Sequence, residues 1–509
     1  MAAAAFHVRA TSDAHSSLPD TAAFLELLAR LRSGGAASDE EREAAALFQW
    51  DQELVVARAP GRMDVMGGVA DYSGSLVLQL PIAEACHAAV QRGPGDGLLR
   101  VVSLGGAAGA RASAFTLPAA ALLDAAGAPV EYDAARKTLG ADVATRWAAY
   151  PLGAVHVLAR EGGADFAASG LRLLLSSAVP EGKGVSSSAA VEVATMSAAA
   201  ALAGKQLDGR TLALWCQRAE NLVVGAPCGV MDQMASALGR PGQLLALLCR
   251  PAEVQGTVAL GDHAAVWGID SGVRHSVGGS DYGAVRAGTF MGRTIVSKLA
   301  AAARAAQADA HAGTVRSTSA AARPGGPAHL TEVPPHEFER AFAAALPEAM
   351  TGAAFAAAHG SHGDDVTQLR SDATYAVRTP AAHAVYEHFR VSAFQLALGA
   401  PRGDAQLALL GQLMHQSHES YSRCGLGSPG TDALVALVEE LGPSRGLFGA
   451  KITGGGSGGT VCVLGRADAE EAVLEVAARY AKATGAQPYI FKGTSPGAVA
   501  FGVLRLTPK

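Results

Sequence analysis

The sequence has few cysteines and no long uninterrupted apolar run, and each scarcity excludes a class of protein. Its 6 cysteines lie far apart and form no C-x-x-C pair, which argues against a disulfide framework and for reduced thiols in a cytoplasmic compartment. The most apolar window, residues 184–203, contains four serines and Glu192, so it is too polar to cross a bilayer. We therefore expect a protein without structural disulfides or membrane spans.

The chain also lacks an excess of positive charge. It carries 41 Lys and Arg residues against 46 Asp and Glu residues, for a formal net charge of −5. A nucleic acid or an anionic membrane is therefore disfavoured as a partner. The N-terminal stretch "MAAAAFHVRATSDAHSS" has no apolar core of signal-peptide length and contains an acidic residue. Because it is rich in Ser and Ala and includes an arginine, an organelle leader stays open as an alternative to a cytoplasmic location.

A chain of 509 residues can form two or three domains with complete cores. We expect an N-terminal extension over residues 1–50, with a single amphipathic helix at "TAAFLELLARLRSG". Strand-like apolar runs begin at Leu54 and include parts of residues 171–180 and 265–272. Strands and helices do not alternate in a steady β-α-β rhythm, which predicts an α+β fold and not a doubly wound sheet.

The C-terminal part of the chain contains further patterns. Helical periodicity dominates residues 335–442, and "DAEEAVLEVAARYAKATG" is typical of an amphipathic helix. That helix lies between two stretches that predict strands, "GTVCVLG" and "GAVAFGVLRL". Residues 299–328 are of low complexity, which indicates a loop insertion or a frayed helix.

The strongest local signal is the segment "PEGKGVSSSAA" at residues 180–190. It follows an apolar run and opens a helix-forming stretch. Backbone N–H groups and the positive end of a helix point into such a turn, which makes it an anion site. The glycines let the main chain approach oxygen atoms closely. The spacing of a P-loop is absent, and a serine cap on an ordinary helix is the alternative interpretation.

A second segment, "ENLVVGAPCGVMDQM" at residues 220–234, contains two acids. Glu220 and Asp232 stand on either side of a Gly-Ala-Pro-Cys-Gly turn. Next to a phosphate, one carboxylate would hold Mg²⁺ while the other faces an acceptor hydroxyl. Taken alone, two acids at this separation are more often surface charges.

Two further stretches are rich in glycine. "KITGGGSGGTVCVLG", at residues 451–465, has five glycines within six positions, which indicates a backbone wrapped closely around a ligand or a flexible turn. "GRMDVMGGVADYSG", at residues 61–74, places Asp64 and Asp71 on either side of a glycine pair. None of these segments is specific when it is considered alone.

In this order, the segments resemble the signature motifs of the GHMP small-molecule kinases, which include galactokinase and the homoserine, mevalonate and phosphomevalonate kinases. "ARAPGRMDVMGGVADYSGSLVLQLPI" is similar to the galactokinase signature G-R-x-N-x-I-G-E-H-T-D-Y-x-x-G. "VPEGKGVSSSAAVEVA" resembles the phosphate loop, and "CQRAENLVVGAPCGVMDQMAS" agrees with galactokinases at nearly every position. "GVRHSVGGSDYGAVR" and "GAKITGGGSGGTVCVL" complete the set. The resemblance covers roughly residues 54–509.

The resemblance implies a two-lobed α+β fold with the active site between the lobes. A ribosomal-protein-S5-like N-terminal lobe is expected over residues 51–285, and a ferredoxin-like C-terminal lobe over residues 286–509. The resemblance also implies ATP and Mg²⁺ as cofactors, a small-molecule sugar as substrate, and phosphorylation of its anomeric hydroxyl. A monomer is compatible with the sequence.

Matched position by position, the resemblance implies a role for each motif residue. Asp232 corresponds to the base that faces the anomeric hydroxyl, and Arg62 to the cation that keeps this aspartate ionised. Ser188 and Glu220 correspond to the Mg²⁺ ligands. Lys183 replaces a glycine common in galactokinases, either as a phosphate contact or as a solvated loop lysine. The other positions expected to bind the nucleotide are Gly182, Gly184, Ser186, Ser187, Gly455 and Gly456.

The expected substrate depends on Gly68 and Val69. Asp71, Gly229 and Tyr282 correspond to sugar contacts, but galactokinases carry Glu-His at the positions of Gly68 and Val69, where the pair reaches toward the C6 hydroxymethyl. L-Arabinose has the C1–C4 configuration of galactose and lacks C6. A Glu-His pair would then be left unbonded, at a cost of about 1–3 kcal/mol for each group. The first motif resembles the plant-type L-arabinokinase branch, and we expect L-arabinose 1-phosphate and ADP as products.

Several alternatives stay open. A galactokinase would share the fold and act on a sugar that is one carbon larger. A galactokinase-like fold also serves as a non-catalytic sugar sensor, which the intact set of motif residues disfavours. Plant members carry a glycosyltransferase-like region ahead of the kinase, so this chain is either a stand-alone kinase or a shortened product. His415 and His418 lie at helical spacing, and without a third ligand we interpret them as packing or surface residues.

Overall fold

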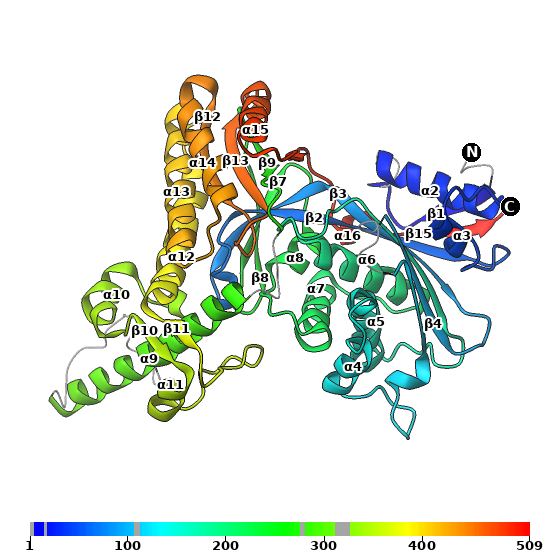
Figure 1. Ribbon diagram of the computed structural model, residues 1–509, viewed down its shortest axis with the longest axis horizontal. Coiled ribbons are helices and arrows are strands. Elements are labelled where there is room, and N and C mark those ends of the chain that lie inside the picture. The colour runs from blue at the N-terminus through cyan, green and yellow to red at the C-terminus, as the bar shows by residue number, and fades with distance from the viewer. Residues whose placement is uncertain (1–4, 15–17, 106–111, 275–279, 311–325) are drawn as a thin grey trace.

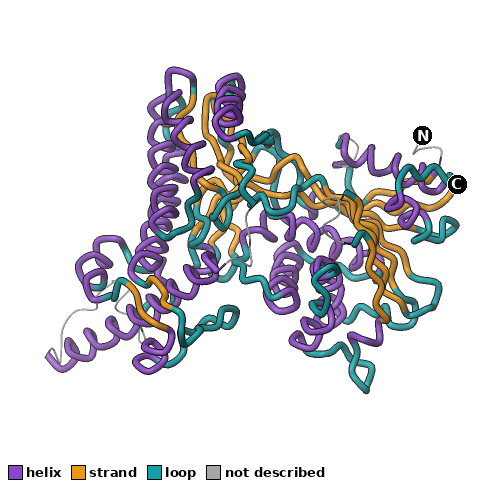
Figure 2. Tube along the Cα trace, in the orientation of Figure 1, coloured by secondary structure: helices purple, strands orange, loops and turns teal. Residues whose placement is uncertain are grey.

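The computed structural model describes residues 5–14, 18–105, 112–274, 280–310 and 326–509. The chain is built around two large β-sheets, and a group of helices extends from the second one (Figure 1). Helices and strands are mixed along the whole chain (Figure 2), which confirms the predicted α+β class. Within these described ranges, no helix combines the length and the apolarity that a membrane crossing requires.

A nine-stranded sheet forms the first lobe. Its main path runs β1-β15-β2-β3-β6-β4-β5, and β7 and β8 continue from the beginning of β3. β4 pairs with β6 in parallel, whereas β2, β3 and β15 pair in antiparallel fashion. The strands are β1 (Phe6–Ala10), β2 (Leu54–Met66), β3 (Leu76–Arg92), β4 (Leu98–Leu104), β5 (Ala114–Pro118), β6 (Leu171–Ser177), β7 (Gln243–Leu248), β8 (Glu253–Ala259) and β15 (Val503–Pro508).

Helices cover both faces of this sheet. Successive residues of a strand point to opposite faces, so Val55 of β2 joins the main core while Val56 packs with the N-terminal helices. The predicted N-terminal helix is α2, and β1 pairs with the last strand, so the first fifty residues contribute to this lobe. The helices of this lobe are α2 (Pro19–Arg32), α3 (Asp39–Ala45), α4 (Tyr132–Leu139), α5 (Ala149–Gly162), α6 (Ser187–Leu202), α7 (Gly209–Arg218), η5 (Ala219–Val224) and α8 (Met231–Leu238).

The second lobe contains a four-stranded antiparallel sheet in the order β12-β13-β9-β14. Val438 and Val473, from two of its helices, pack against Val461 and Val463 of β13. The strands are β9 (Ala264–Asp270), β12 (Leu447–Ile452), β13 (Thr460–Arg466) and β14 (Ile490–Phe491). The helices are α13 (Asp404–Arg423), α14 (Pro429–Leu441) and α15 (Glu470–Thr484).

A helical group with its own apolar cluster joins the second lobe (Figure 1). Met291 and Val385 lie in this cluster, on the two longest helices of the group. The elements are α9 (Ser280–Ala310), α10 (Pro335–Ala341), β10 (Ala349–Thr351), α11 (Gly352–His359), β11 (Thr374–Ala376) and α12 (Arg378–Leu398).

One sequence prediction differs from the structure. The strand predicted for "GAVAFGVLRL" is wrong in its first half, because α16 (Ala498–Phe501) forms there and β15 begins only at Val503. A short apolar run fits either a helix or a strand, and pairing with β2 selects only its last residues. Residues 299–310 continue α9 as a helix, and residues 311–325 of the low-complexity segment lie outside the described residues.

The two lobes exchange segments along the chain. β9 precedes α9 in sequence but belongs to the second sheet, and β15 returns from the second lobe to pair with β2. The predicted boundaries after residues 50 and 285 stay a prediction. The exchange brings the loop after β12 against β2, where the Asp64 N–H donates to Thr453 Oγ1 over 2.6 Å. The pocket described next lies at this junction.

Candidate active site

A glycine- and serine-rich turn leads from β6 into α6. Gly182, Gly184 and Ser186 have left-handed backbones, with φ values of 72°, 71° and 61°, so the turn depends on small residues. The Ser186 side chain does not cap α6 in the described structure, and its hydroxyl is buried without a partner among the described residues. The N–H groups at the start of α6 therefore remain available to ligand oxygens.

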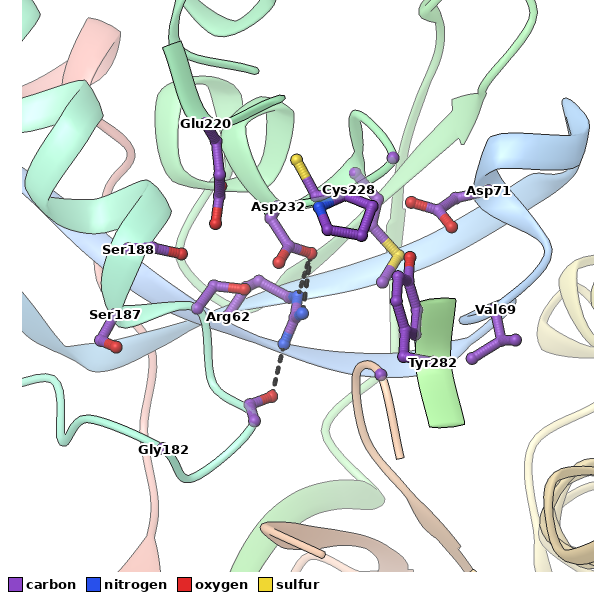
Figure 3. Close-up of a pocket in the computed structure, with 16 residues that line it drawn as sticks. Arg62, Val69, Asp71, Gly182, Ser187, Ser188, Glu220, Cys228, Asp232 and Tyr282 are labelled. Carbon is purple, nitrogen blue, oxygen red and sulfur yellow. Dashed lines mark hydrogen bonds and ion pairs between the residues drawn. The ribbon is translucent and has the colours of Figure 1, made fainter. Parts of the chain in front are cut away.

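Arg62 and Asp232 form the centre of the pocket (Figure 3). Arg62 of β2 donates from Nε and Nη2 to Oδ1 of Asp232, in the first turn of α8, over 2.9 and 2.7 Å. Its Nη1 donates to the Gly184 carbonyl over 2.7 Å, so one side chain joins the acid to the turn. Burial opposes the charge of Arg62, but Asp232 and Asp64 raise its pKa above the ordinary value. A charged guanidinium therefore faces Asp232.

Glu220 lies beside Ser188 on one side of this pair (Figure 3). Glu220 Oε2 accepts a hydrogen bond from Gln233 Nε2 over 2.6 Å. Burial and then the charge of Asp232 raise the pKa of Glu220 to about 7. A hydroxyl and a carboxylate are the hard oxygen donors that Mg²⁺ accepts. The donor set of Ser188 and Glu220 therefore fits this cation.

Asp71 and Tyr282 lie on the other side of the pocket (Figure 3), and Gly229 also lines the pocket. Asp71 begins the short helix η2 (Asp71–Ser73), and a Cβ added to Gly229 would lie 1.7 Å from its Oδ2. Asp71 Oδ1 is buried and has no hydrogen-bond partner among the described residues. Burial and then the charge of Asp232 raise the pKa of Asp71 to about 7. A buried carboxyl oxygen without a partner is suited to a ligand hydroxyl.

The turn that follows β2 forms the apolar end of the pocket. Gly67 has a φ of 107°, and Val69 has a φ of 60°, which is rare for a β-branched residue. The Val69 side chain lines the pocket. Gly68 does not line the pocket, and a Cβ added to it would lie 2.0 Å from Tyr421 Oη. Gly68 and Val69, which the sequence interpretation treats as one pair, therefore have different surroundings.

Most of the predicted site residues line this single pocket. Gly68, Lys183 and Gly456 do not: Lys183 Nζ pairs with Asp270 Oδ2 over 2.6 Å, and a Cβ on Gly456 would lie 2.7 Å from Leu426 Cβ. The predicted residues that do line the pocket are Arg62, Val69, Asp71, Gly182, Gly184, Ser186, Ser187, Ser188, Glu220, Gly229, Asp232, Tyr282 and Gly455.

Other residues of the pocket and of its support were not predicted from the sequence. Pro227, Cys228 and Met231 also line the pocket, and all three lie within the quoted segment 220–234. Arg286 donates to the Cys228 carbonyl over 3.0 Å and pairs with Asp364 over 2.8 Å. Arg286 lies in "SDYGAVR", one helical turn after Tyr282, and this spacing could have indicated that Arg286 lies near the pocket.

The two histidines of α13 lie away from the pocket lining. His415 pairs with Glu439 over 3.0 Å, and His418 with Asp432 over 3.1 Å, both toward α14. Across the described ranges, no group of three or more His, Cys, Asp or Glu side chains is arranged to hold a metal ion.

Three family profiles match the chain. They are described as GHMP kinases N terminal domain, at residues 149–240, GHMP kinases C terminal, at residues 403–482, and Galactokinase galactose-binding signature, at residues 45–92. The matched residues include the turn into α6, Glu220 and Asp232, and the segment from β2 to β3.

Individual proteins are also similar to the chain. L-arabinokinase of Arabidopsis thaliana is 46% identical over 96% of this chain, which spans only 51% of that protein. Galactokinase of Chloroflexus aurantiacus is 32% identical over 82% of this chain and 86% of its own length. Lactococcus lactis galactokinase complexed with galactose has a similar fold, with a TM-score of 0.63 at 20% identity over 90% of this chain and 97% of its own. The chain thus spans about half the length of the plant relative.

Proposed function

The chain belongs to the GHMP kinase family, in its galactokinase branch, and on this premise we propose that it is an ATP-dependent sugar-1-kinase that acts on L-arabinose. The observation that carries the proposal is the Arg62–Asp232 pair, which lies between the start of α6 and Asp71 Oδ1. Among the described residues, no side chain caps that helix and none bonds to that oxygen. A phosphate on one side and a sugar hydroxyl on the other would meet at Asp232. The similarity to a plant L-arabinokinase supports the same substrate.

Asp232 is the proposed base. It accepts the proton of the anomeric hydroxyl while that oxygen forms a bond to the γ-phosphorus of ATP and ADP leaves. Arg62 holds the carboxylate in position through two hydrogen bonds to Oδ1. Phosphoryl transfer has a loose transition state, so the protein contributes mainly by positioning the reactants and by neutralising charge.

The phosphates of ATP would lie against Gly182, Gly184 and the serines that open α6. The N–H groups and hydroxyls there are donors for the phosphate oxygens. Ser188 and Glu220 would hold the Mg²⁺ that accompanies ATP, which offsets the charge of the phosphates when it is bound. The hydrogen bond from Gln233 orients the Glu220 carboxyl for that role.

The apolar end of the pocket supports a pentose substrate. Val69 is the side chain that the turn after β2 contributes to the pocket lining. A C6 hydroxymethyl directed at Val69 would lose its hydrogen bonds to water, whereas L-arabinose has no such group. A uronic acid would place a carboxylate there without a cation from this turn. The selectivity we propose therefore disfavours both D-galactose and the uronic acids.

A coupled ADP-release assay across four sugars tests this proposal. We expect L-arabinose to be preferred over D-galactose by roughly ten- to several-hundred-fold in kcat/KM, with D-galacturonate and D-glucuronate as poor substrates. A preference for D-galactose would make the chain a galactokinase. If no sugar stimulates ADP release, the kinase proposal fails, and titration calorimetry with the same sugars then tests the non-catalytic sensor.

A further inference from the structure

Gly68 is required by the space around it and not by its backbone conformation. Gly67 is left-handed, whereas Gly68 lies outside the left-handed region, so its backbone angles are open to other residues. A Cβ at position 68 would nevertheless lie 2.0 Å from Tyr421 Oη, 2.4 Å from Asp64 Oδ2 and 3.0 Å from the Gly454 carbonyl. Side-chain carbon atoms do not approach oxygen atoms this closely, so at least one neighbour would have to move.

The nearest of these atoms, Tyr421 Oη, is held in place by its contacts. The Tyr421 hydroxyl donates to the Gly454 carbonyl over 2.9 Å and lies 3.4 Å from Asp64 Oδ2. That carboxylate pairs with Lys451 Nζ over 2.8 Å, and neither side chain of the pair is exposed. Lys451 Nζ also lies 5.1 Å from the centroid of the Tyr421 ring. The buried ion pair therefore holds Asp64 Oδ2, and the hydrogen bond to Gly454 holds Tyr421 Oη, so the two atoms nearest to position 68 are both fixed.

The same turn is held from α12. The Gly67 N–H donates to Glu387 Oε1 over 3.1 Å. His383 Nε2 lies 3.2 Å from the Gly68 carbonyl, and because a carbonyl only accepts, Nε2 must carry the hydrogen. Burial lowers the pKa of His383 to about 4, so the neutral ring accepts at Nδ1 from Ser420 Oγ over 2.8 Å. We call Asp64, His383, Glu387, Tyr421 and Lys451 the Gly68 clamp.

The clamp lies directly behind the wall of the pocket. Tyr421 packs in one buried cluster with Val69 and Tyr282, and both of these residues line the pocket. If position 68 carried a side chain, the turn would have to shift and Val69 would shift with it. The clamp thus determines which side chain of this turn lines the pocket.

We propose that Tyr421 is a specificity-determining residue, which acts as a positioning residue by excluding any side chain at position 68 and by holding Val69 against the sugar. The identity of the sugar in this inference rests on the proposed function, whereas the steric exclusion does not. A consequence is that polar groups cannot be introduced at position 68 to accept a C6 hydroxymethyl while Tyr421 is present.

A double-mutant cycle tests the exclusion without any substrate. We expect Gly68→Ala to lower the melting temperature strongly in the wild-type chain, and by less than half as much in the Tyr421→Phe background, because the vacated space admits the methyl group or a shift of Asp64. Equal costs in both backgrounds would overturn the exclusion. If Gly68→Ala alone yields no folded protein, recovery of folded protein in the double variant gives the same answer.

A sugar comparison tests the effect on specificity. We expect Tyr421→Phe to reduce the ratio of kcat/KM for L-arabinose to that for D-galactose by about three- to tenfold. A change in ATP binding affects both sugars alike, so this ratio reports on the sugar wall. Tyr375→Phe is the matched control, because Tyr375 is also buried and its hydroxyl accepts from the Arg370 N–H away from the pocket.

The outcomes separate the two proposals. An unchanged ratio in Tyr421→Phe, or an equal loss in Tyr375→Phe, overturns the specificity role even if the kinase activity is confirmed. If the wild-type chain phosphorylates neither sugar, the proposed function fails and the stability cycle still decides whether Tyr421 excludes a side chain at position 68. If neither Gly68→Ala variant folds, the sugar ratio of Tyr421→Phe decides.

Discussion

The two sides of the pocket are assembled in different ways. The side proposed for phosphate takes its turn and the start of α6 from one continuous segment, residues 180–190. The side proposed for sugar combines Val69, Asp71, Gly229 and Tyr282, which come from three segments of both lobes. Local backbone geometry therefore builds the phosphate-binding turn of this side, to which Glu220 is added from another segment, η5. The sugar side depends on contacts between distant segments. A substitution there therefore also acts through neighbouring residues that lie outside any short sequence motif.

The largest expected effect concerns Asp232, where the two sides meet. Asp232→Asn should lower kcat by at least about 100-fold, because a positioned proton acceptor is lost, while binding of a non-hydrolysable ATP analogue persists. A residual rate is expected because a loose transition state needs little proton abstraction. Single-turnover phosphorylation of L-arabinose measures the effect. Turnover close to wild type would remove Asp232 from the role of base.

The second prediction is confined to the phosphate side. Glu220→Gln should raise the Mg²⁺ concentration needed for half-maximal activity by about tenfold or more, because the cation loses a charged ligand. The KM for sugar should stay within about twofold of wild type, since Glu220 lies on the other side of the Arg62–Asp232 pair. The comparison between the two sides breaks down if the Mg²⁺ dependence is unchanged and the sugar KM rises instead.

The third prediction is confined to the sugar side. Val69→Gly should reduce the preference for L-arabinose over D-galactose by about tenfold, because the space for a hydroxymethyl opens. Its stability should stay near wild type: about 1–2 kcal/mol of left-handed strain is relieved, against about 1.5–3 kcal/mol of lost burial. Val65→Gly is the matched control, since Val65 is fully buried in β2 with ordinary φ.

Thermal melts and the sugar panel should therefore separate the two valine variants. Val65→Gly is expected to lose more stability and to keep the sugar ratio. An unchanged ratio in Val69→Gly would mean that another part of the wall sets selectivity.

The smallest expected effect is the pH dependence from Asp71. Its pKa is about 7 in the folded chain and about 3.9 when unfolded, so between these values the folded state binds the extra proton. Its contribution to stability is present at low pH and is lost as the pH rises toward 7. Asp71→Asn removes this loss. The melting temperature of the variant minus that of wild type should increase by a few °C between pH 5 and 8, as scanning calorimetry measures. A constant difference would contradict the buried, protonated carboxyl.

Sequence alone determined the features that depend on local patterns. The α+β class follows from runs of apolar residues and their periods, and the turn into α6 follows from glycines and serines at residues 180–190, because such residues permit left-handed backbones and expose N–H groups wherever they occur. The pairing of Arg62 with Asp232 was accessible only through resemblance, since nothing local relates residues from β2 and α8. The same limit explains the error over residues 498–501, where an apolar run carries no period that distinguishes helix from strand.

Only the tertiary structure decided what the glycine pair does. In the sequence, Gly67, Gly68 and Val69 form one short stretch, of which Gly68 and Val69 share one interpretation. In the fold, Gly67 adopts a positive φ, and Tyr421 occupies the space that a side chain at position 68 would need. Of the three residues, Val69 alone lines the pocket. The reason is physical: the volume available to a side chain is set by the atoms packed against it. At position 68 those atoms belong to Asp64 of β2, to Tyr421 of α13 and to Gly454 after β12, and the last two lie more than three hundred residues further along the chain.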